Sequence, residues 1–183
     1  MVLNSNSSQL LVVDVQEKLL PVMYKKEELI KNSKTIIKSA DELGIPILFS
    51  EQYPKGLGNT DSELLNLSTN IKIFEKKTFS CVDDGNIFDC IKHRVSIGLK
   101  QIVIVGIETH ICVLQSALGL KERGFEVYVV IDATASRNKD SLELAKMRLL
   151  FNQVNIVSTE MVVFEWLKVS GTDIFKKLSR LIK

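Results

Sequence analysis

Three ionisable side chains follow apolar runs of the kind that form buried strands. Asp14 ends the segment LLVVD, Lys76 follows IKIF, and Cys112 comes a short turn after IVIVG. A carboxylate, an ammonium and a thiol can together carry out acyl transfer, with the thiol as nucleophile, the carboxylate as base and the cation stabilising charge. Each residue also has a structural interpretation: Asp14 as a turn cap, the Lys76–Lys77 pair as a solvated turn, and Cys112 as a small buried hydrophobe.

Cys112 has the most distinctive local setting of the three. A predicted strand, Gly106, a turn and a predicted helix follow one another, so that Cys112 lies near a helix start. A helix N-terminus lowers a thiol pKa from about 8.5 and presents N–H groups to an anion. Cys81 and Cys90 lack this setting, and we expect both to be core residues. His110 stands two residues before Cys112, a spacing that does not bring two side chains together, so it is not expected to act as the base.

Composition excludes several classes of protein. The 183 residues fit a single domain, 1–183, and the 24 Lys+Arg and 22 Asp+Glu leave a net charge of +2 without a basic stripe. We therefore expect no nucleic-acid binding. Three cysteines without C-x-x-C spacing predict neither disulfides nor zinc, and favour a cytoplasmic location. No apolar run approaches the ~20 residues of a membrane span, and the N-terminus does not have the pattern of a signal peptide.

The chain also has no pattern typical of a bound cofactor. Two histidines without metal-ligand spacing predict no metal site. The first predicted strand is not followed by G-x-G-x-x-G, so no dinucleotide is expected. We expect a small-molecule substrate and no cofactor.

Short apolar runs alternate with longer segments of helical period along the whole chain. This alternation predicts an α/β fold, with a parallel sheet covered by helices on both faces. In such a fold, ligands bind beyond the carboxyl ends of the strands, where Asp14, Lys76 and Cys112 are expected. The predicted strands are 10–13, 45–49, 71–74, 102–105, 127–131 and 154–157, and the predicted helices are 27–43, 87–99, 112–123, 142–151, 164–169 and 174–182.

Several motifs in combination resemble those of the isochorismatase-like cysteine hydrolases, a superfamily that includes nicotinamidases and isochorismatases. They are LLVVDVQ around Asp14, K-x-x-F-S from Lys76 to Ser80, and GIETHICV from Gly106 to Val113; SEQYPKGLG and VIDATASR point to the isochorismatase domain-containing branch. The resemblance implies a Rossmann-like three-layer α/β/α fold, with a six-stranded parallel sheet in the order 3-2-1-4-5-6. In that order Asp14 and the cysteine turn are neighbours.

The resemblance also implies roles for individual residues. The catalytic triad would be Asp14, Lys76 and Cys112, with Lys76 chosen because the family lysine stands four residues before the serine. The backbone N–H groups of Glu108 and Cys112 would form an oxyanion hole, and a cis peptide would join Ile107 to Glu108. The residues expected to line the substrate pocket are Gln16, Glu51, Gln52, Tyr53, Phe79 and Ile107.

The implied activity is hydrolysis of an amide-type C–N bond of a small molecule through a thioester, in a homo-oligomer (dimer or tetramer). Two alternatives stay open: an isochorismatase-type hydrolase of a non-amide bond, and a catalytically idle oligomeric binding protein. Isochorismatases proper lack the cysteine, so Cys112 favours acyl chemistry. The metal-binding histidines of nicotinamidases have no counterpart in residues 48–58, which disfavours a metal-assisted nicotinamidase.

Two polar residues and the C-terminal region complete the expectations. Asp132, after the fifth predicted strand, is expected to hold neighbouring loops by hydrogen bonds, and Ser80 to cap a turn or helix. The apolar residues near the C-terminus pack either on the core or on a second subunit; they are Phe164, Trp166 and Leu167.

Overall fold

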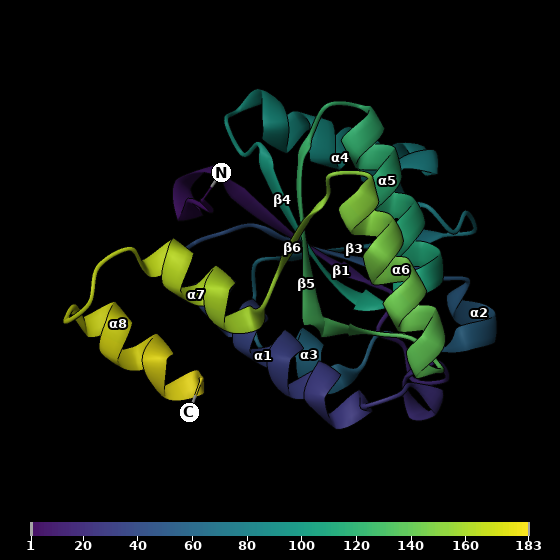
Figure 1. Cartoon of the computed structure of the whole chain (residues 1–183), viewed down its shortest axis with the longest axis horizontal. Coiled ribbons are helices and arrows are strands. Elements are labelled where there is room, and N and C mark those ends of the chain that lie inside the picture. The colour runs from purple at the N-terminus through teal and green to yellow at the C-terminus, as the bar shows by residue number, and fades with distance from the viewer. Residues whose placement is uncertain (1, 183) are drawn as a thin grey trace.

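The computed structural model describes residues 2–182 and contains a six-stranded sheet in the order β3-β2-β1-β4-β5-β6 (Figure 1). Every neighbouring pair of strands is parallel. The expected fold class and strand order are confirmed. The strands are β1 Ser8–Val13, β2 Ile47–Gln52, β3 Ile71–Lys76, β4 Gln101–Ile107, β5 Glu126–Ala135 and β6 Asn155–Val157.

The central strands are apolar on both faces because each face packs against helices. In β1, Leu10 and Val12 belong to one hydrophobic cluster, while Leu11 and Val13 belong to another. All six residues of β1 and all seven of β4 are buried. Alternate side chains of one strand therefore pack into two separate cores, one on each side of the sheet.

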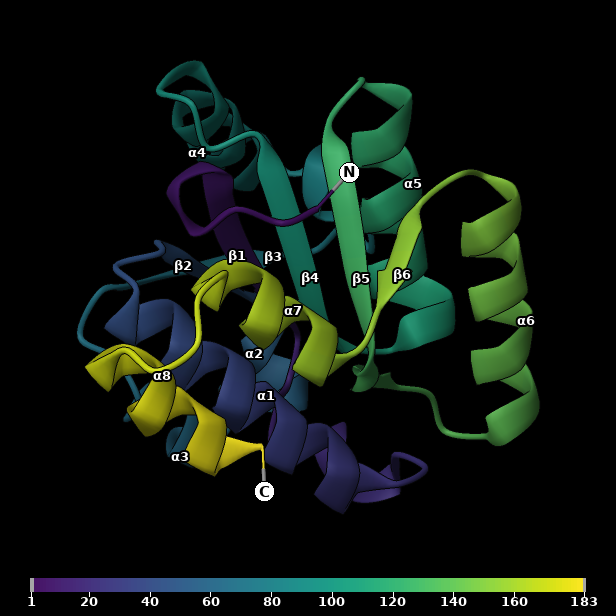
Figure 2. The same cartoon turned by 60° about the vertical axis from the view of Figure 1, so that its left-hand side comes forward.

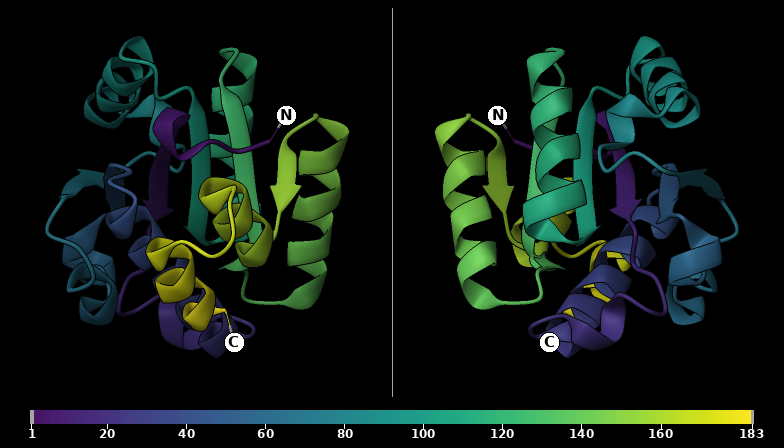
Figure 3. Two further views of the ribbon diagram at one scale, coloured as in Figure 1. Left: turned by 90° about the vertical axis from the view of Figure 1, so that its left-hand side faces the viewer. Right: turned by 90° about the vertical axis from the view of Figure 1, so that its right-hand side faces the viewer.

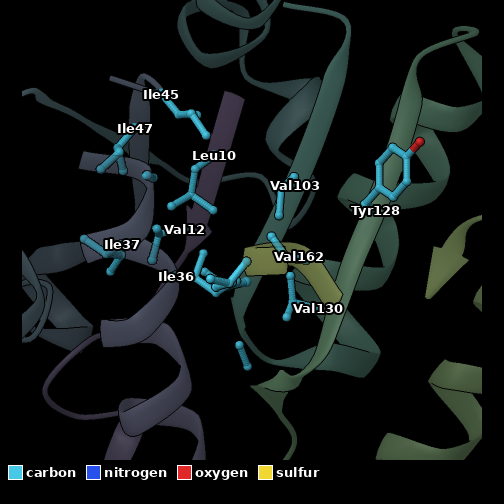
Figure 4. Packing of buried hydrophobic residues seen from close by; sticks show 14 of the residues in the cluster. Leu10, Val12, Ile36, Ile37, Ile45, Ile47, Val103, Tyr128, Val130 and Val162 are labelled. Atoms are coloured by element: carbon cyan, nitrogen blue, oxygen red, sulfur yellow. The ribbon is translucent and has the colours of Figure 1, made fainter. Parts of the chain in front are cut away.

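Helix α1 (Lys26–Glu42) covers the first face together with α7 (Thr159–Leu167) and α8 (Asp173–Leu178). Figure 2 shows α7 and α8 lying beside α1, although they are far from it in sequence. Ile36 of α1 and Val162 of α7 lie near Val103 and Val130 of the sheet, and Ile37 of α1 belongs to the same cluster (Figure 4).

The opposite face is covered by α4 (Gly85–Ser96), α5 (Leu114–Glu122) and α6 (Lys139–Phe151). The right-hand view of Figure 3 shows α5 in front of the sheet, whereas α7 and α8 lie in front in the left-hand view. Ile87, Ala117 and Leu149 come from these three helices and are buried in the second cluster. This is the three-layer arrangement expected from the sequence.

The C-terminal segment packs on the core of its own chain. Trp166 is buried, and its indole Nε1 donates a hydrogen bond of 2.9 Å to Ser8 Oγ in β1. Leu167 packs against the first cluster, and Phe164 lies 40% exposed next to Phe175. The alternative of a second subunit is not needed to bury Trp166.

Some predicted boundaries differ from those in the structure. β3 continues to Lys76, so this lysine is the last residue of the strand. β5 continues to Ala135 because a shift in register between Ile104 and Gly106 of β4 accommodates extra residues. Asp132 therefore lies within β5, where its Oδ1 accepts hydrogen bonds from the N–H and hydroxyl of Thr159. Its predicted hydrogen-bonding role is confirmed.

The loop after β2 contains two one-turn helices that no apolar pattern predicted. They are α2 (Pro54–Leu57) and α3 (Ser62–Leu65). Among residues 2–182, no helix is long and apolar enough to cross a membrane. The 3-10 helices are Ser5–Ser7, Leu20–Val22, Cys81–Asp83 and Ser179–Leu181.

Candidate active site

Asp14 lies directly beyond the end of β1, at the carboxyl edge of the sheet, and its side chain is fully buried. Its backbone has φ +51°, a left-handed conformation that is uncommon for a residue with a side chain. The Asp14 N–H donates to Ser50 O at 3.1 Å, and Gln16 N donates to Asp14 O at 2.8 Å. These backbone contacts hold the carboxylate at the sheet edge.

Lys76 approaches Asp14 from the end of β3. Its Nζ lies 2.7 Å from Asp14 Oδ2, and both side chains are wholly inaccessible to solvent. The same ammonium donates to Gln52 Oε1 at 2.7 Å and to the carbonyl oxygens of Thr78 and Phe79 at 3.2 Å. A buried ion pair of this kind is tolerated when its remaining donors and acceptors are satisfied, as they are here. Lys77, the alternative lysine, is exposed.

The Lys76 charge is stabilised in this environment. Burial alone lowers the pKa of Lys76, but the negative charge of Asp14 and the hydrogen bond to it outweigh burial, so that the pKa of Lys76 is raised. Lys76 is therefore a permanent cation at neutral pH, available to stabilise negative charge beside it.

Gly106 brings the cysteine turn against Asp14. It pairs with Val13 across β1 and β4, and has φ +118°. A Cβ at this position would lie 2.1 Å from Val13 O, so only glycine permits such a close approach of the two strands. The chain then passes through a cis peptide between Ile107 and Glu108, as the resemblance implied.

Cys112 lies in a π-helical turn, Thr109–Val113, that precedes α5. It is 7% exposed, and its thiol lies close enough to Asp14 for the carboxylate to act on the thiol pKa. The expected α-helical start at Cys112 is therefore wrong by two residues, because the wider turn comes first. The structure brings the three predicted triad residues together.

The expected lowering of the thiol pKa is also wrong. Burial, and secondly the negative charge of Asp14, raise the pKa of Cys112 far above its usual range, although Lys76 acts in the opposite direction. The helix terminus does not overcome desolvation beside a carboxylate. At neutral pH the thiol is therefore protonated, with Asp14 positioned to accept its proton.

Glu108 anchors the cysteine turn to the end of β5. Its Oε2 accepts hydrogen bonds from the backbone N (3.0 Å) and Nε (3.2 Å) of Arg137. His110 Nδ1 lies 2.9 Å from Ser136 Oγ and 4.0 Å from Glu108 Oε2. Of the two residues whose backbone N–H groups are expected to bind an oxyanion, Glu108 directly precedes this turn and Cys112 lies within it.

A cavity of about 600 Å³ opens beside Lys76. Of the residues expected to form the pocket, Tyr53 lines this cavity, and Phe79 lies nearby in sequence with 56% of its surface exposed. Gln52 contacts Lys76 through its Oε1. The cavity is lined by Tyr53, Pro54, Lys55, Glu75, Lys76, Lys77, Thr78 and Asp84.

Three other residues expected in the pocket are engaged in the protein interior. Gln16 is buried, and its amide bonds the backbone of Gln52 and Gly58, which fixes the loop after β2. Glu51 Oε1 accepts from the N–H and hydroxyl of Thr60. Ile107 is buried in a small cluster that includes Met23, Leu29 and Ala135.

Gln16, Glu51 and Ile107 therefore have partners within the protein, and a substrate-contacting role for these residues stays a prediction.

Ser50 and Cys81 were not predicted as site residues. Ser50 Oγ lies 2.7 Å from Asp14 Oδ1, and Cys81 Sγ lies 3.6 Å from Ser50 Oγ. Ser50 pairs with Val13 in the β1–β2 register, which places it next to Asp14. Only the pairing of β1 with β2 places Ser50 next to Asp14, and the sequence alone does not reveal this pairing. Ser80 caps a turn by accepting from Val82 N, as expected.

The structure has no clear metal site in its described part. Within residues 2–182, no group of three or more His, Cys, Asp or Glu side chains is arranged to hold a metal ion.

Residues 8–161 match the family described as Isochorismatase domain. Isochorismatase family protein 1A of Dictyostelium discoideum is 38% identical over 180 residues, covering 96% of this chain and 86% of that protein.

Two solved structures share the fold over the whole of this chain. The structure of MAR1 ribonuclease from Caenorhabditis elegans has a TM-score of 0.91 and 34% identity, with 92% of that chain covered. The YcaC gene product from Escherichia coli, described as an octameric hydrolase of unknown specificity, has a TM-score of 0.92, 24% identity and 89% coverage.

Proposed function

We propose, from the premise that this chain belongs to the isochorismatase family of hydrolases, that it cleaves an amide-type C–N bond of a small molecule through a cysteine thioester. The observation that carries the proposal is that Asp14 and the Cys112 turn follow the ends of adjacent strands, with Asp14 acting on the thiol and itself paired with Lys76 at 2.7 Å. A protonated thiol beside a buried carboxylate is suited to attack coupled to proton transfer.

The proposed reaction begins with proton transfer from Cys112 to Asp14. The sulfur attacks the substrate carbonyl carbon, and the carbonyl oxygen becomes an oxyanion bound by the N–H groups of Glu108 and Cys112. Lys76 stabilises the negative charge in the site throughout. As the tetrahedral intermediate collapses, the C–N bond breaks and Asp14 gives its proton to the leaving amine.

Water completes the proposed cycle by hydrolysing the thioester. Asp14 accepts a proton from the water as it attacks the acyl carbon, and the C–S bond breaks to release the carboxylic acid. The proton returns to the Cys112 sulfur. The sum is amide plus water giving acid plus amine, without a cofactor.

Cys112→Ala and Asp14→Asn together test this proposal. Ammonia release is measured over a panel of small amides and ureides, with Cys90→Ala as a control that removes a half-buried thiol of α4. We expect Cys112→Ala to lower turnover at least about 1,000-fold, with an unchanged thermal melt. Undiminished ammonia release by Cys112→Ala would reject the proposal.

The same variants separate the alternatives. A hydrolase of a non-amide bond that uses the aspartate would lose activity in Asp14→Asn but keep it in Cys112→Ala. An idle binding protein would release no product from any substrate. The panel includes RNA, since the worm protein is described as a ribonuclease.

We also propose that the chain assembles with copies of itself. The octameric state stated for the E. coli relative supports this, as does the outward face of α6. Leu144, Met147, Leu150 and Phe151 are between 52% and 89% exposed there. Large exposed apolar patches are typical of interfaces. Light scattering of Met147→Glu/Phe151→Glu tests this, because a loss of mass to that of one chain is expected.

A reducing, cytoplasmic location is part of the same proposal. All three cysteines are free thiols. A thiol nucleophile stays functional where disulfide formation is disfavoured. Microscopy of the tagged protein in its own cell tests the location, and a signal outside the cytoplasm would reject it.

A further inference from the structure

Cys81 is a second buried thiol close to Asp14 that the proposed reaction does not use. Its side chain is fully buried in the 3-10 turn after β3, and its Sγ lies 3.6 Å from Ser50 Oγ. Burial, and secondly the charge of Asp14, raise the pKa of Cys81 to about 11. Cys81 is therefore a neutral S–H group at physiological pH, able to donate one hydrogen bond.

Ser50 connects this thiol to the carboxylate. Its hydroxyl is 2.7 Å from Asp14 Oδ1, and an ionised carboxylate can only accept, so Ser50 donates its single hydroxyl hydrogen to Asp14. The oxygen of Ser50 then accepts the S–H of Cys81. The three groups form one directed chain: thiol to hydroxyl to carboxylate.

The other end of the chain is attached to the helix that follows the nucleophile. Cys81 N donates to Ser116 Oγ at 2.8 Å, and Ser116 is a buried residue of α5. Ser116 stands four residues after Cys112, one helical turn further along. Side-chain hydrogen bonds therefore connect Asp14 to Ser50 and Ser50 to Cys81, and the backbone N–H of Cys81 is bonded to the helix that follows Cys112.

We propose that Ser50 and Cys81 are positioning residues, which fix the Asp14 carboxylate relative to Cys112 through the hydrogen bond that Ser50 donates. This role rests on the proposed function, in which Asp14 exchanges a proton with Cys112. A hydrogen bond donated to a carboxylate stabilises its charged form, and a donor further along the chain strengthens that bond. Ser50 therefore acts directly, and Cys81 acts through Ser50.

Few titratable groups act on Asp14 in this setting. They are Lys76 at the end of β3, Cys81 after it, and Cys112 in the π-helical turn. Lys76 bonds Oδ2 and Ser50 bonds Oδ1, so the two oxygens are held by different donors. Removing the Ser50 hydroxyl leaves the ion pair with Lys76 in place, which allows the effect of the chain to be measured separately.

The experiment is the pH dependence of Cys112 alkylation by iodoacetamide, followed by peptide mass spectrometry in the intact protein. Alkylation requires the thiolate, which forms when Asp14 takes the proton. The alkylation rate therefore rises as the Asp14–Cys112 pair loses its first proton. The pH at the midpoint of that rise is a property of the two coupled groups together. Ser33→Ala is the matched control, because it removes a buried hydroxyl of α1 that is outside the chain.

We expect Ser50→Ala to raise the midpoint by about one pH unit, because the carboxylate loses a donor. Cys81→Ala should raise it by less, about a third to a half of a unit. Ser50→Thr and Cys81→Ser keep a donor in place, and each should stay within about 0.3 unit of wild type. With a substrate available, Ser50→Ala should lower kcat and leave KM unchanged.

An unchanged midpoint in Ser50→Ala would overturn the proposal, as would an equal shift in Ser50→Thr. If Ser50→Ala does not fold, the Cys81→Ala and Cys81→Ser pair decides: a shift in the first alone supports the chain, and equal profiles overturn it. The readout needs no turnover. Failure of the hydrolase proposal would therefore appear as an absence of product, independently of whether the midpoint moves.

Discussion

The two sides of the candidate site are held in place by different physical means. On the side of the base, Asp14 is held by a buried ammonium and a buried hydroxyl, each 2.7 Å from one of its oxygens. On the side of the nucleophile, the turn carrying Cys112 is positioned by the close backbone approach at Gly106 and by the Glu108 carboxylate, which bonds the exposed Arg137. The position of Asp14 should therefore be disturbed by a substitution that removes a hydrogen-bond donor. The position of Cys112 should be disturbed by a substitution that adds a side-chain carbon at Gly106.

This contrast follows from what each group must do. A carboxylate that exchanges a proton needs defined hydrogen-bond partners, because they set its basicity. A thiol makes only weak hydrogen bonds, so its position has to come from the backbone. The same buried region satisfies both needs because β1 and β4 are adjacent in the sheet.

Gly106→Ala should have the largest effect, on the nucleophile side. Its new Cβ would lie 2.1 Å from Val13 O, a backbone atom in a central strand that cannot move aside. We expect a loss of about 5 kcal/mol or more in the free energy of unfolding, comparable to the whole stability of many domains. Urea unfolding measures it.

Gly98→Ala is the matched control for Gly106→Ala. Gly98 has φ +102°, close to the +118° of Gly106, but a Cβ there meets no atom within 4 Å. It should therefore cost only the backbone strain, about 1–2 kcal/mol. Equal losses in the two variants would show that strain, and not the close approach of β1 and β4, explains the requirement for glycine.

Lys76→Met should have the next largest effect, on the base side. It leaves Asp14 buried without its cation, and removing one partner of a buried ion pair costs about 3–5 kcal/mol. The exposed neighbour provides the control, and Lys77→Met should change stability by less than about 0.5 kcal/mol. Urea unfolding at pH 7 measures both.

The double variant Asp14→Asn/Lys76→Met sharpens this test. With the carboxylate neutralised, the loss of Lys76 should be much less harmful, and the double variant should be more stable than Lys76→Met alone. If the losses in free energy of unfolding of the two single variants add up in the double variant, Lys76 stabilises the fold by packing. The base side would then not depend on the charge of the ion pair.

Alkaline pH should weaken the base side by a few kcal/mol. Lys76, Cys81 and Cys112 all have pKa values raised by folding, that of Cys81 to about 11. Groups with raised pKa values contribute stability that is complete below their unfolded pKa and is lost as pH rises through the folded value. We expect the free energy of unfolding to fall between about pH 8.5 and pH 11, by roughly 2–3 kcal/mol through Cys81 alone.

Cys81→Ala should make that decline less steep, whereas Cys90→Ala should keep the wild-type slope. Urea unfolding at several pH values between 7.5 and 11 gives the slopes. A stability that is flat across this range would contradict the burial of protonated thiols beside Asp14.

Sequence patterns predicted the layers and the strand ends, because strands that are buried on both faces leave long apolar runs. The meeting of Asp14, Lys76 and Cys112 required the strand order, which came from the resemblance and was confirmed by the structure. The contact of Ser50 with Asp14 could not be predicted, because a single serine at a strand end does not indicate any particular partner. The direction of the Cys112 pKa shift depends on burial and on a carboxylate almost 100 residues away in the sequence, which a local helix-start pattern does not contain.

Arg137→Ala should have the smallest effect, on the nucleophile side, and it tests whether charge also holds that turn. The Arg137 side chain is 60% exposed where it meets Glu108, and exposed ion pairs contribute about 0–1 kcal/mol. The backbone N of Arg137 still donates to Glu108 Oε2 at 3.0 Å in the variant. We therefore expect a loss of about 0.5 kcal/mol in the free energy of unfolding in urea, with a smaller loss in high salt.

Glu108→Ala removes the acceptor of both hydrogen bonds from Arg137 and should cost about 1–2 kcal/mol. If Arg137→Ala instead cost as much as Lys76→Met, the cysteine turn would depend on charge as strongly as the base does, and the two sides of the site would be held by the same means.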